Sequence, residues 1–570
     1  MFHNIAPYLK KYRKQFIVGP TFKLLEAILE LTIPVFMSYM VDYGILRHDA
    51  GYIWRTGGLM LLIIAVGLSS AIVCQYSASV ASQGFGTALR SGLFSHMQRL
   101  SFSQIDRFGT DSLTNRVTND VNQLQLAVAM VIRLVIRAPF ICIGSIVAAL
   151  LIDWKLALIF VVAVPVFVTV LAVIMGKTFP LYGKRQQKLD RLGATLRENI
   201  AGVRVIRAFA QEDRQQEAFS SANEDLTGMS IQVARFSNLL NPATTLIMNA
   251  GILAILWFSG FRVDAGALTQ GQIIAFLNYM TQVLATLIVV ANLVVTFTKA
   301  YASLGRINEV LETQPDIPFD HGEPFTKTKA ILVFDQVEFS YPGEREPVLS
   351  NVSFSLMAGE TLGIIGATGS GKTTLLNLIP RFYDATKGTV FVCGRPVRDY
   401  SLQELRGMIG LSPQRTELFS GTVEENIRGG REDLSLDAVK RAATTAQATA
   451  FIEAMPGQFG AAVERGGANL SGGQRQRLGI ARALAQEPAI LLLDDSFSAL
   501  DYATDQRLRA ALRENCPDMT VVIVSQRVSA VQTADQILVL SDGQPAGLGT
   551  HDELYATCQA YREIVDSQEK

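Results

Sequence analysis

The stretch TLGIIGATGSGKTT, residues 361–374, decides how the second half of this 570-residue chain folds. It reads as a short apolar strand, a glycine-rich loop and a helix start, and residues 366–373 match the pattern GxxxxGK(S/T) without a mismatch. In such a loop the backbone N–H groups turn inward around phosphates, Lys372 reaches the terminal phosphates, and the Thr373 hydroxyl can ligate Mg2+. We therefore predict a nucleotide site. Its predicted contacts are Gly366, Thr368, Gly369, Ser370, Gly371, Lys372, Thr373 and Thr374.

A second apolar strand delivers carboxylates to the same kind of site. The stretch ILLLDDSFSALD, residues 490–501, is a run of β-forming residues that ends in Asp494 and Asp495. A buried strand of this type supplies the outer carboxylate of a magnesium site, which we assign to Asp494. If this strand belongs to an ATPase, the residue after Asp494 is where a glutamate would be expected to steer the attacking water, and here it is Asp495. The sequence therefore leaves open whether the site hydrolyses its nucleotide or only holds it.

The stretch NLSGGQRQRLGIARALAQEP, residues 469–488, predicts a second helix start that can bind an anion. Ser471 is the expected N-cap, Gly472 and Gly473 allow close approach of another group, and the helix runs toward Pro488. A helix N-terminus attracts anions through its free N–H groups and its dipole. Two such starts in one chain indicate that the second faces the nucleotide of a different molecule.

Hydropathy divides the chain into two halves. Six apolar stretches each come close to the ~20 residues that a helix needs to cross a bilayer. They cover roughly residues 16–40, 57–80, 127–152, 155–178, 236–260 and 271–297. We predict a six-helix membrane domain with two cytosolic coupling loops over residues 1–300; the alternative is six buried helices of a large soluble bundle. Residues 301–330 are polar and read as a linker, and short β runs alternating with helical stretches predict an α/β domain over residues 331–570.

The bulk composition excludes several classes of protein. Lys+Arg and Asp+Glu are equal at 51 each, so no nucleic-acid partner is expected. Five scattered cysteines show no zinc-ligand spacing and indicate no disulfide framework. Arginines and lysines between the second and third spans, and between the fourth and fifth, place both stretches and the N-terminus in the cytosol.

With these motifs together, the sequence resembles a type IV ATP-binding cassette (ABC) exporter half-transporter over its whole length. LSGGQ at residues 470–474, ahead of LLLDD and after Lys372, is the most specific part of the match. The resemblance implies a multi-pass protein of the inner (plasma) membrane, with a cytoplasmic α/β P-loop domain that binds ATP and Mg2+ and dimerises head to tail. The first coupling element would lie in residues 103–121 and the second near residues 199–212.

The resemblance also assigns roles to residues outside the phosphate loop. Tyr341 would stack on adenine, and Gln414 would sense the metal and the attacking water; the alternatives are a strand-edge tyrosine and a polar loop residue. Ser471, Gly472, Gly473 and Gln474 would complete the ATP site of the other chain, and the loop from Ser498 to Asp501 would touch the opposite domain.

Two positions depart from the family pattern. The acid after Asp494 is Asp495 instead of glutamate, which withdraws the carboxylate by about 1.5 Å, and Gln526 replaces the histidine after the next core strand. Glutamine cannot titrate near neutrality or become cationic. We predict the degenerate-site subunit of a bacterial heterodimeric multidrug exporter. The alternatives are a homodimeric exporter with slow hydrolysis, an active ATPase in which the substitutions are tolerated, and an ATP-gated channel or signalling ATPase.

Charged residues inside the predicted spans need a reason, because charge is costly in a bilayer. Glu26 and Glu30 lie at i, i+4 in the first span, and Arg133 and Arg137 at i, i+4 in the third. The glutamates could line a cavity for cationic drugs, or the four residues could pair with one another or snorkel to the interface. The sequence favours the second interpretation and does not identify the small-molecule substrate.

Overall fold

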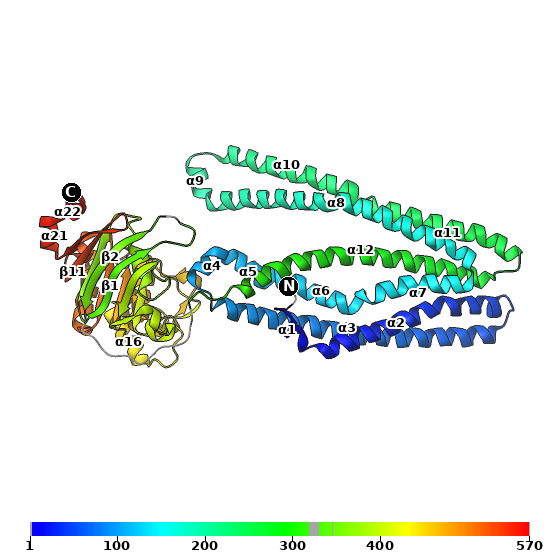
Figure 1. The fold of residues 1–570 in the computed structure, drawn as a ribbon, viewed down its shortest axis with the longest axis horizontal. Helices are drawn as coiled ribbons and strands as arrows, with labels where there is room; N and C mark the ends of the chain where they lie inside the picture. Colours follow the sequence, from blue (N-terminus) through cyan, green and yellow to red (C-terminus); the bar gives the residue numbers. More distant parts are fainter. Residues whose placement is uncertain (1–2, 318–329, 345, 569–570) are drawn as a thin grey trace. The chain divides into compact units, whose positions relative to one another are not determined.

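The computed structural model describes residues 3–317, 330–344 and 346–568 (Figure 1). The chain divides into two units, Met1–His96 with Asp111–Glu312, and Met97–Thr110 with Thr313–Lys570. Residues 318–329 of the predicted linker lie outside the described residues.

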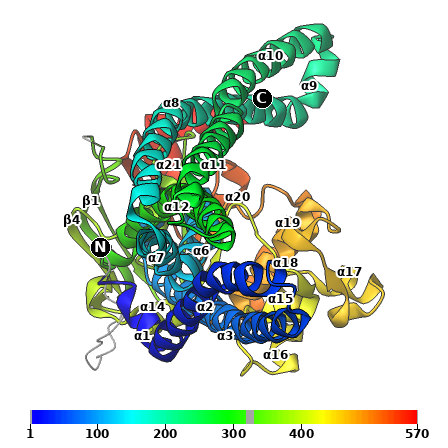
Figure 2. The same cartoon turned by 90° about the vertical axis from the view of Figure 1, so that its right-hand side faces the viewer.

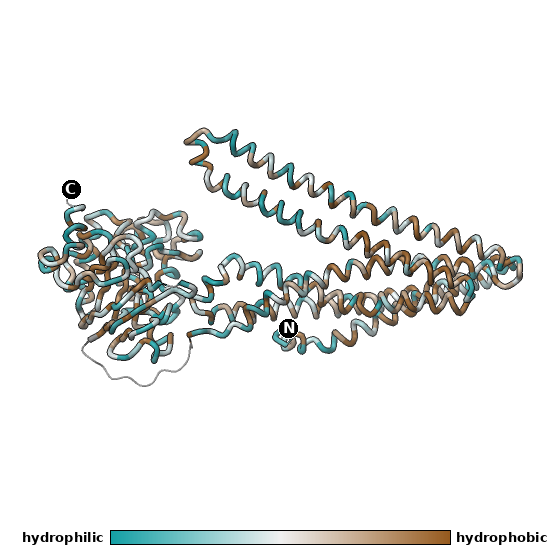
Figure 3. Tube along the Cα trace, turned by 45° about the horizontal axis from the view of Figure 1, so that its top comes forward, coloured by the Kyte–Doolittle hydropathy of each residue, from teal (hydrophilic) through white to brown (hydrophobic). Residues whose placement is uncertain are grey.

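Six helical segments of the first unit are long and apolar enough to cross a membrane, as the sequence predicts. Figure 3 shows them as mainly brown tubes that become more teal along α8 and α10 toward α9. Two of them contain π-helical turns, and two short helices, α1 (Ala6–Lys10) and α9 (Val203–Ala208), accompany them. The segments are α2 with η1 (Arg13–Tyr39, Met40–Ile45); α3 (Ala50–Met97); α5, η2, α6, η3 and α7 (Thr110–Asn115, Arg116–Asp120, Val121–Met130, Val131–Val135, Arg137–Ile152); α8 (Trp154–Ala201); α10 and α11 (Glu212–Ser237, Leu240–Asp264); and α12 (Gln270–Glu312).

Helix α12 is the centre of the first unit and packs against α2, α6, α7, α8 and α11 (Figure 2). The buried Tyr279 donates its hydroxyl hydrogen bond to the Leu31 carbonyl oxygen of α2 at 2.8 Å. At the start of α12, the Gly271 N–H donates a hydrogen bond to the Asp42 carboxylate of η1 at 2.9 Å. A Cβ at Gly271 would lie 2.2 Å from the Ser38 carbonyl oxygen, so only glycine permits this approach of α12 to α2.

The charges inside the spans pair with one another for the most part. Arg137 of α7 binds Glu30 of α2 at 2.7 Å, and Lys23 binds Glu26 within α2 at 2.7 Å. Arg133 donates to the Ser79 hydroxyl at 3.2 Å. These contacts agree with the interpretation in which the charges satisfy one another, and they add Lys23, which the sequence argument did not include.

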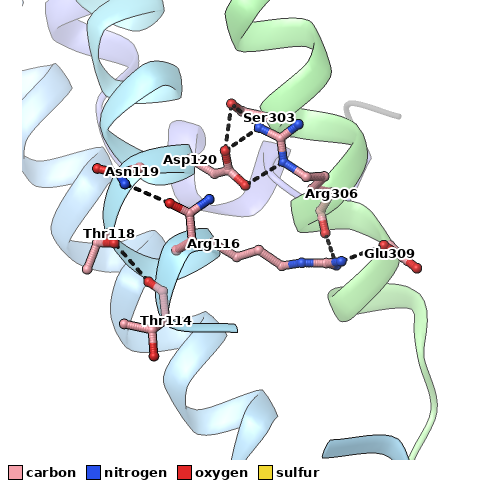
Figure 4. A network of polar contacts seen from close by, with 9 residues as sticks. Thr114, Arg116, Thr118, Asn119, Asp120, Ser303, Arg306 and Glu309 are labelled. Carbon is pink, nitrogen blue, oxygen red and sulfur yellow. Dashed lines mark hydrogen bonds and ion pairs between the residues drawn. The ribbon is translucent and has the colours of Figure 1, made fainter. Parts of the chain in front are cut away.

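A polar network joins the third and sixth spanning segments (Figure 4). The buried Asp120 accepts from Arg306 Nε at 2.8 Å and from the Ser303 hydroxyl at 2.9 Å. Arg116 donates to the Arg306 carbonyl oxygen at 2.6 Å and pairs with Glu309 at 2.8 Å. The network therefore fixes the register of η2 against the last turns of α12.

The second unit contains a four-stranded antiparallel sheet, a six-stranded sheet and a two-stranded ribbon. The orders are β2-β1-β4-β5, β12-β11-β3-β10-β9-β6 and β7-β8, and the six-stranded sheet is parallel except for β12. The strands are β1 (Ala330–Phe339), β2 (Leu349–Met357), β3 (Thr361–Gly366), β4 (Lys387–Val392), β5 (Arg395–Pro396), β6 (Ile409–Ser412), β7 (Gly421–Thr422), β8 (Ala462–Val463), β9 (Ile490–Asp494), β10 (Thr520–Val524), β11 (Gln536–Ser541) and β12 (Gln544–Gly549).

Helices cover the sheets of this unit, so β9 and β10 are buried along their whole length and read as unbroken apolar runs. The helices are α4 (Phe102–Phe108), α13 (Lys372–Leu378), α14 (Leu402–Gly407), α15 (Val423–Arg428), α16 (Leu436–Thr445), α17 (Thr449–Ala454), α18 (Gly472–Leu484), α19 (Tyr502–Asn515), α20 (Val528–Val531), α21 (His551–Thr557) and α22 (Gln559–Gln568), with short 3-10 turns at Val397–Asp399, Gln458–Gly460 and Arg465–Gly467.

Candidate functional site

Parallel pairing brings four loop segments to one edge of the six-stranded sheet. Val524 of β10 is in register with Ile364 of β3 and with Asp494 of β9, and Ser412 of β6 is in register with Leu493. The carboxyl ends of parallel strands meet at the same sheet edge, where ligands bind in open α/β sheets. The phosphate loop, the two acids, Gln414 and Gln526 all follow these strand ends.

The glycine-rich loop adopts backbone conformations that favour glycine. Gly369 and Gly371 have φ values of +87° and +93°, in the left-handed region. A Cβ at Gly371 would lie 2.7 Å from Leu349 Cδ2 and 3.1 Å from the Val348 carbonyl oxygen. The loop therefore passes directly over the start of β2 before α13 begins at Lys372.

Lys372 folds back into the loop instead of pointing to solvent. Its Nζ donates to the carbonyl oxygens of Gly366 at 2.9 Å and Ala367 at 2.6 Å, and the residue is 8% exposed. Burial lowers the pKa of the Lys372 ammonium, while Asp494 and Asp495 oppose that shift. A cation held by carbonyl dipoles in a buried loop can be transferred to phosphate oxygens with little further loss of hydration.

Asp494 and Thr373 form the candidate metal position. Thr373 Oγ1 donates to Asp494 Oδ1 at 3.3 Å, and Asp494 is 5% exposed. Burial raises the pKa of the Asp494 carboxyl, the Thr373 hydrogen bond and Lys372 oppose the rise, and Asp495 adds to it. A hydroxyl and one carboxylate are donors that Mg2+ accepts when phosphate oxygens supply the rest. Among the described residues, no group of three or more His, Cys, Asp or Glu side chains could hold a metal without such help.

A cavity of about 210 Å3 collects most of the predicted site residues. Ten of the predicted residues line it, together with Val348, Val524 and Ser525, which the sequence argument missed. Val348 precedes β2, Val524 is the last residue of β10 and Ser525 follows it, so no local signal marks them. The ten are Thr368, Gly369, Gly371, Lys372, Thr373, Thr374, Gln414, Asp494, Asp495 and Gln526. Gly366 and Ser370 line the adjoining hollow beneath α22, together with Gln526.

Asp495 has a strained backbone. Its φ is +45°, in the left-handed region, and its N–H donates to the Val524 carbonyl oxygen at 2.9 Å. Non-glycine residues occupy this region rarely, and aspartate is among those that tolerate it best. Asp495 lines the cavity from this backbone conformation.

Tyr341 lies beside the cavity without lining it. Its hydroxyl is 3.1 Å from Thr374 Oγ1, and its ring packs edge-on against Phe339 and Tyr383 at centroid distances of 4.9 and 5.3 Å. Tyr383 in turn donates to Asp106 of α4 at 2.8 Å, and the rings of Phe102 of α4 and Phe382 pack at a tilt with their centroids 4.5 Å apart. The aromatic cluster therefore connects the candidate adenine position with part of the predicted first coupling element.

The LSGGQ segment lies outside the cavity. Ser471 is the N-cap of α18, as predicted, and exchanges hydrogen bonds with Gln474 in a capping box. Ser471 and Gly472 are exposed, and neither they nor Gly473 and Gln474 line the Lys372 cavity. Asp501 caps α19 by accepting from the Thr504 N–H at 2.9 Å. The structure thus separates the predicted site into a cavity and an exposed second surface.

One contact of the site was not predictable from any motif. The Gln568 carboxamide in α22 donates to the Gln526 carbonyl oxygen at 2.7 Å and accepts from the Val528 N–H at 2.8 Å. The Gln568 side chain is therefore hydrogen-bonded to the backbone of two residues in the loop that follows β10. His551 does not reach this loop, because its ring is bonded to the Tyr561 hydroxyl at 2.7 Å.

Comparison with known proteins gives matches over both halves of the chain. Residues 16–287 match the family model described as ABC transporter transmembrane region, and residues 349–498 match the one described as ABC transporter. An uncharacterized ABC transporter ATP-binding protein of Mycobacterium tuberculosis is 36% identical over 99% of this chain and 97% of its own length. A probable multidrug resistance ABC transporter ATP-binding/permease protein of Bacillus subtilis is 32% identical over 99% and 96%. The structure of a bacterial Atm1-family ABC exporter with ATP bound superimposes with a TM-score of 0.82 at 24% identity, over 98% of this chain and 99% of that one.

Proposed function

The chain belongs to the ABC transporter family, with a transmembrane region and an ATPase domain on one polypeptide, and from this premise we propose that it is a subunit of an ATP-driven exporter of amphipathic small molecules. Six candidate spans and the exporter fold support the membrane role. The Bacillus subtilis relative, whose description names multidrug resistance, supports drugs or other amphipathic compounds as the substrate class.

ATP binding follows from the ABC domain, and the described residues fit Mg-ATP. The backbone N–H groups from Thr368 to Thr373 would hold the phosphates, and Lys372 would exchange its carbonyl partners for phosphate oxygens. Thr373, Asp494 and Gln414 would hold Mg2+, which when bound neutralises charge on the terminal phosphates. Tyr341 would support the adenine ring from beside Thr374.

The observation that carries the more specific proposal is the pair Asp495 and Gln526 in one cavity with Lys372. A water-activating carboxylate at Asp495 is one methylene short, and a shift of about 1 Å can cost on the order of 100-fold in rate. Gln526 can hydrogen-bond a phosphate but cannot carry positive charge as negative charge develops. The site of this chain therefore retains ATP and hydrolyses it poorly.

The LSGGQ segment, in which Ser471 and Gly472 are exposed, supports a role in a second site. Its helix start is intact and capped, and its residues line no part of this chain's own cavity. ABC half-transporters dimerise, so this surface would complete the ATP site of a non-identical partner. That partner would supply a glutamate after its own strand-end aspartate, a histidine in the loop after its next core strand, and an altered signature.

The experiment is steady-state ATP hydrolysis by the chain purified alone in lipid, after equilibrium binding has shown that it holds ATP. Binding with negligible turnover supports a degenerate site and directs the search to a partner that restores hydrolysis. Turnover on the order of 1 per second, the ordinary enzyme range, would mean that Asp495 and Gln526 suffice and would favour the homodimeric exporter. Ionic current or signalling without uphill transport would favour the channel or signalling ATPase.

A further inference from the structure

An apolar groove runs between α8 and α11, away from every predicted site residue. It has a volume of about 640 Å3 and is lined by aliphatic and aromatic side chains, with Lys155 and Arg262 at one end. We propose that this groove binds one acyl chain of an anionic glycerophospholipid, with the lipid phosphate at Lys155.

The groove is built by one face of each helix. Its lining residues on α8 recur from Lys155 to Val166 at helical spacing, and those on α11 from Ile247 to Arg262 do the same. Large exposed side chains such as Val162 and Phe258 form its rim, whereas Ala163, Ala250 and Ala254 are small lining residues. The lining residue Gly251 is buried, and a side chain there would meet Met280 of α12. The hollow exists because small residues on two facing helix surfaces leave space between larger neighbours.

The α8 side of the groove is about as long as one leaflet of a bilayer, and its α11 side is somewhat longer. From Lys155 to Val166 the α8 face rises about 16 Å, and from Arg262 to Ile247 the α11 face rises about 22 Å, at 1.5 Å per residue. Half of a ~30 Å hydrocarbon core is about 15 Å. The charged end adjoins Asp153 and Trp154 at the start of α8, where the chain turns between two spans. Tryptophan and charged residues of this kind mark the membrane–water interface.

The charge at this end favours an anionic headgroup. The Asp153 carboxylate is occupied, because it accepts from Arg262 and from the Lys155 and Leu156 N–H groups. Lys155 has no carboxylate partner among the described residues, and its Nζ lies 5.8 Å from the centroid of the Trp154 ring. Asp264 is exposed and does not line the groove. One positive charge therefore remains for the ligand.

The side chains at the rim of the groove are exposed in the described unit. Val162 is 65% exposed and Phe261 is 62% exposed, so an acyl chain lying in the groove would cover apolar surface on both helices. A lipid fits both features, the apolar groove and the single cation at its interfacial end. A helix of a partner chain is the other possible occupant, and the test below distinguishes it from a lipid.

Tryptophan fluorescence provides the test, because the chain has three tryptophans. With Trp54→Phe and Trp257→Phe in place, Trp154 reports on the mouth of the groove. The full chain is reconstituted in nanodiscs of zwitterionic phosphatidylcholine that contain a small fraction of phosphatidylcholine or phosphatidylglycerol brominated near the headgroup end of the acyl chains. We expect the brominated anionic lipid to quench at about fivefold lower mole fraction, the effect of one lysine near the surface.

Three variants distinguish binding of the lipid in the groove from a general attraction of anionic lipid to the protein surface. Lys155→Ala removes the cation, Ala254→Phe fills the groove, and Leu253→Phe places the same ring at a neighbouring position that is 65% exposed and does not line this groove. The proposal requires the fivefold preference to vanish in the first two variants and to persist in the third. Equal quenching by both lipids, or a preference that survives Ala254→Phe, overturns it. Absence of quenching by either lipid in the assembled transporter also overturns it, because another chain then covers the groove.

Discussion

The Gln568 side chain donates a hydrogen bond to the Gln526 carbonyl oxygen at 2.7 Å, and it also accepts one from the Val528 N–H at 2.8 Å. Gln568 and Gln526 are 42 positions apart, on the last described helix and on the loop that closes the nucleotide cavity. The C-terminal helix thus acts as a brace for a loop that faces the candidate phosphate site.

Removal of this brace should loosen the loop without unfolding the domain. Gln568→Ala deletes both bonds, worth about 1 kcal/mol each, so amide exchange in residues 525–531 should accelerate roughly tenfold or more. Gln568→Glu keeps the acceptor but loses the donor and should give an intermediate rate. Hydrogen–deuterium exchange read by mass spectrometry measures this. Gln559→Ala is the control, because Gln559 bonds only to Glu563 on the same helix at 2.9 Å; acceleration there would indicate a general weakening of α22.

The degenerate-site proposal predicts a gain of function. The double variant Asp495→Glu and Gln526→His restores the carboxylate length and a titratable ring, and the chain's own LSGGQ is intact. A homodimer of this variant would therefore contain complete sites, and its ATP turnover should rise by about 10- to 100-fold over the unmodified chain. Phosphate release in liposomes measures it, with Asp495→Asn plus Gln526→His as the matched control. A control as active as the double variant would show that residue 495 does not position water.

Local physics explains why the phosphate loop and the strand ends could be predicted. The φ values of Gly369 and Gly371 demand glycine, and a buried parallel strand such as β9 needs an unbroken apolar run before it can present Asp494. These constraints act on neighbouring residues in the chain, so a short stretch of sequence is enough to reveal them. The same holds for the capping box at Ser471 and Gln474.

Contacts made by tertiary packing left no comparable pattern. The Gln568 brace and the lining residue Val348 depend on which surfaces meet, and each residue type is ordinary at its position. The π-helical turn at Arg116–Asp120 likewise follows from the contacts of its side chains with α12. The Lys23–Glu26 pair, in contrast, lies at i, i+3 within α2 and could have been predicted from the sequence. The helical periodicity of the polar stretches after the second and fourth spans also predicts helices that continue outside the bilayer, and α3 and α8 do continue to Met97 and Ala201.

Asp494 should cost stability in the nucleotide-free protein. Burial raises its folded-state pKa above the unfolded value, so its favourable contribution is present below about pH 4 and is lost as pH rises through the raised folded pKa. Near neutral pH, the Asp494→Asn variant should therefore unfold at a higher temperature than the unmodified chain, by about 2–4 °C for each kcal/mol of stability gained. This difference in unfolding temperature, the gap, should close toward about pH 4. The same variant should lose Mg2+-dependent ATP affinity. Thermal unfolding in detergent at several pH values measures the gap; a gap independent of pH would assign the effect to packing.

The network between Asp120 and Arg306 should respond asymmetrically to its two truncations. The Asp120 side chain is 3% exposed and that of Arg306 is 47% exposed. Arg306→Ala would strand a buried carboxylate, held then by Ser303 alone, and should cost about 3–5 kcal/mol. Asp120→Asn removes the buried charge and leaves an arginine that can turn to solvent, so it should cost less, about 1–2 kcal/mol. Denaturant or thermal unfolding of the purified chain ranks the two. Glu487→Ala, which breaks an exposed pair with Arg441 at 2.9 Å, should cost under about 1 kcal/mol. If Asp120→Asn proved the more damaging change, the arginine and not the carboxylate would be the group that depends on its partner, and the burial argument would fail.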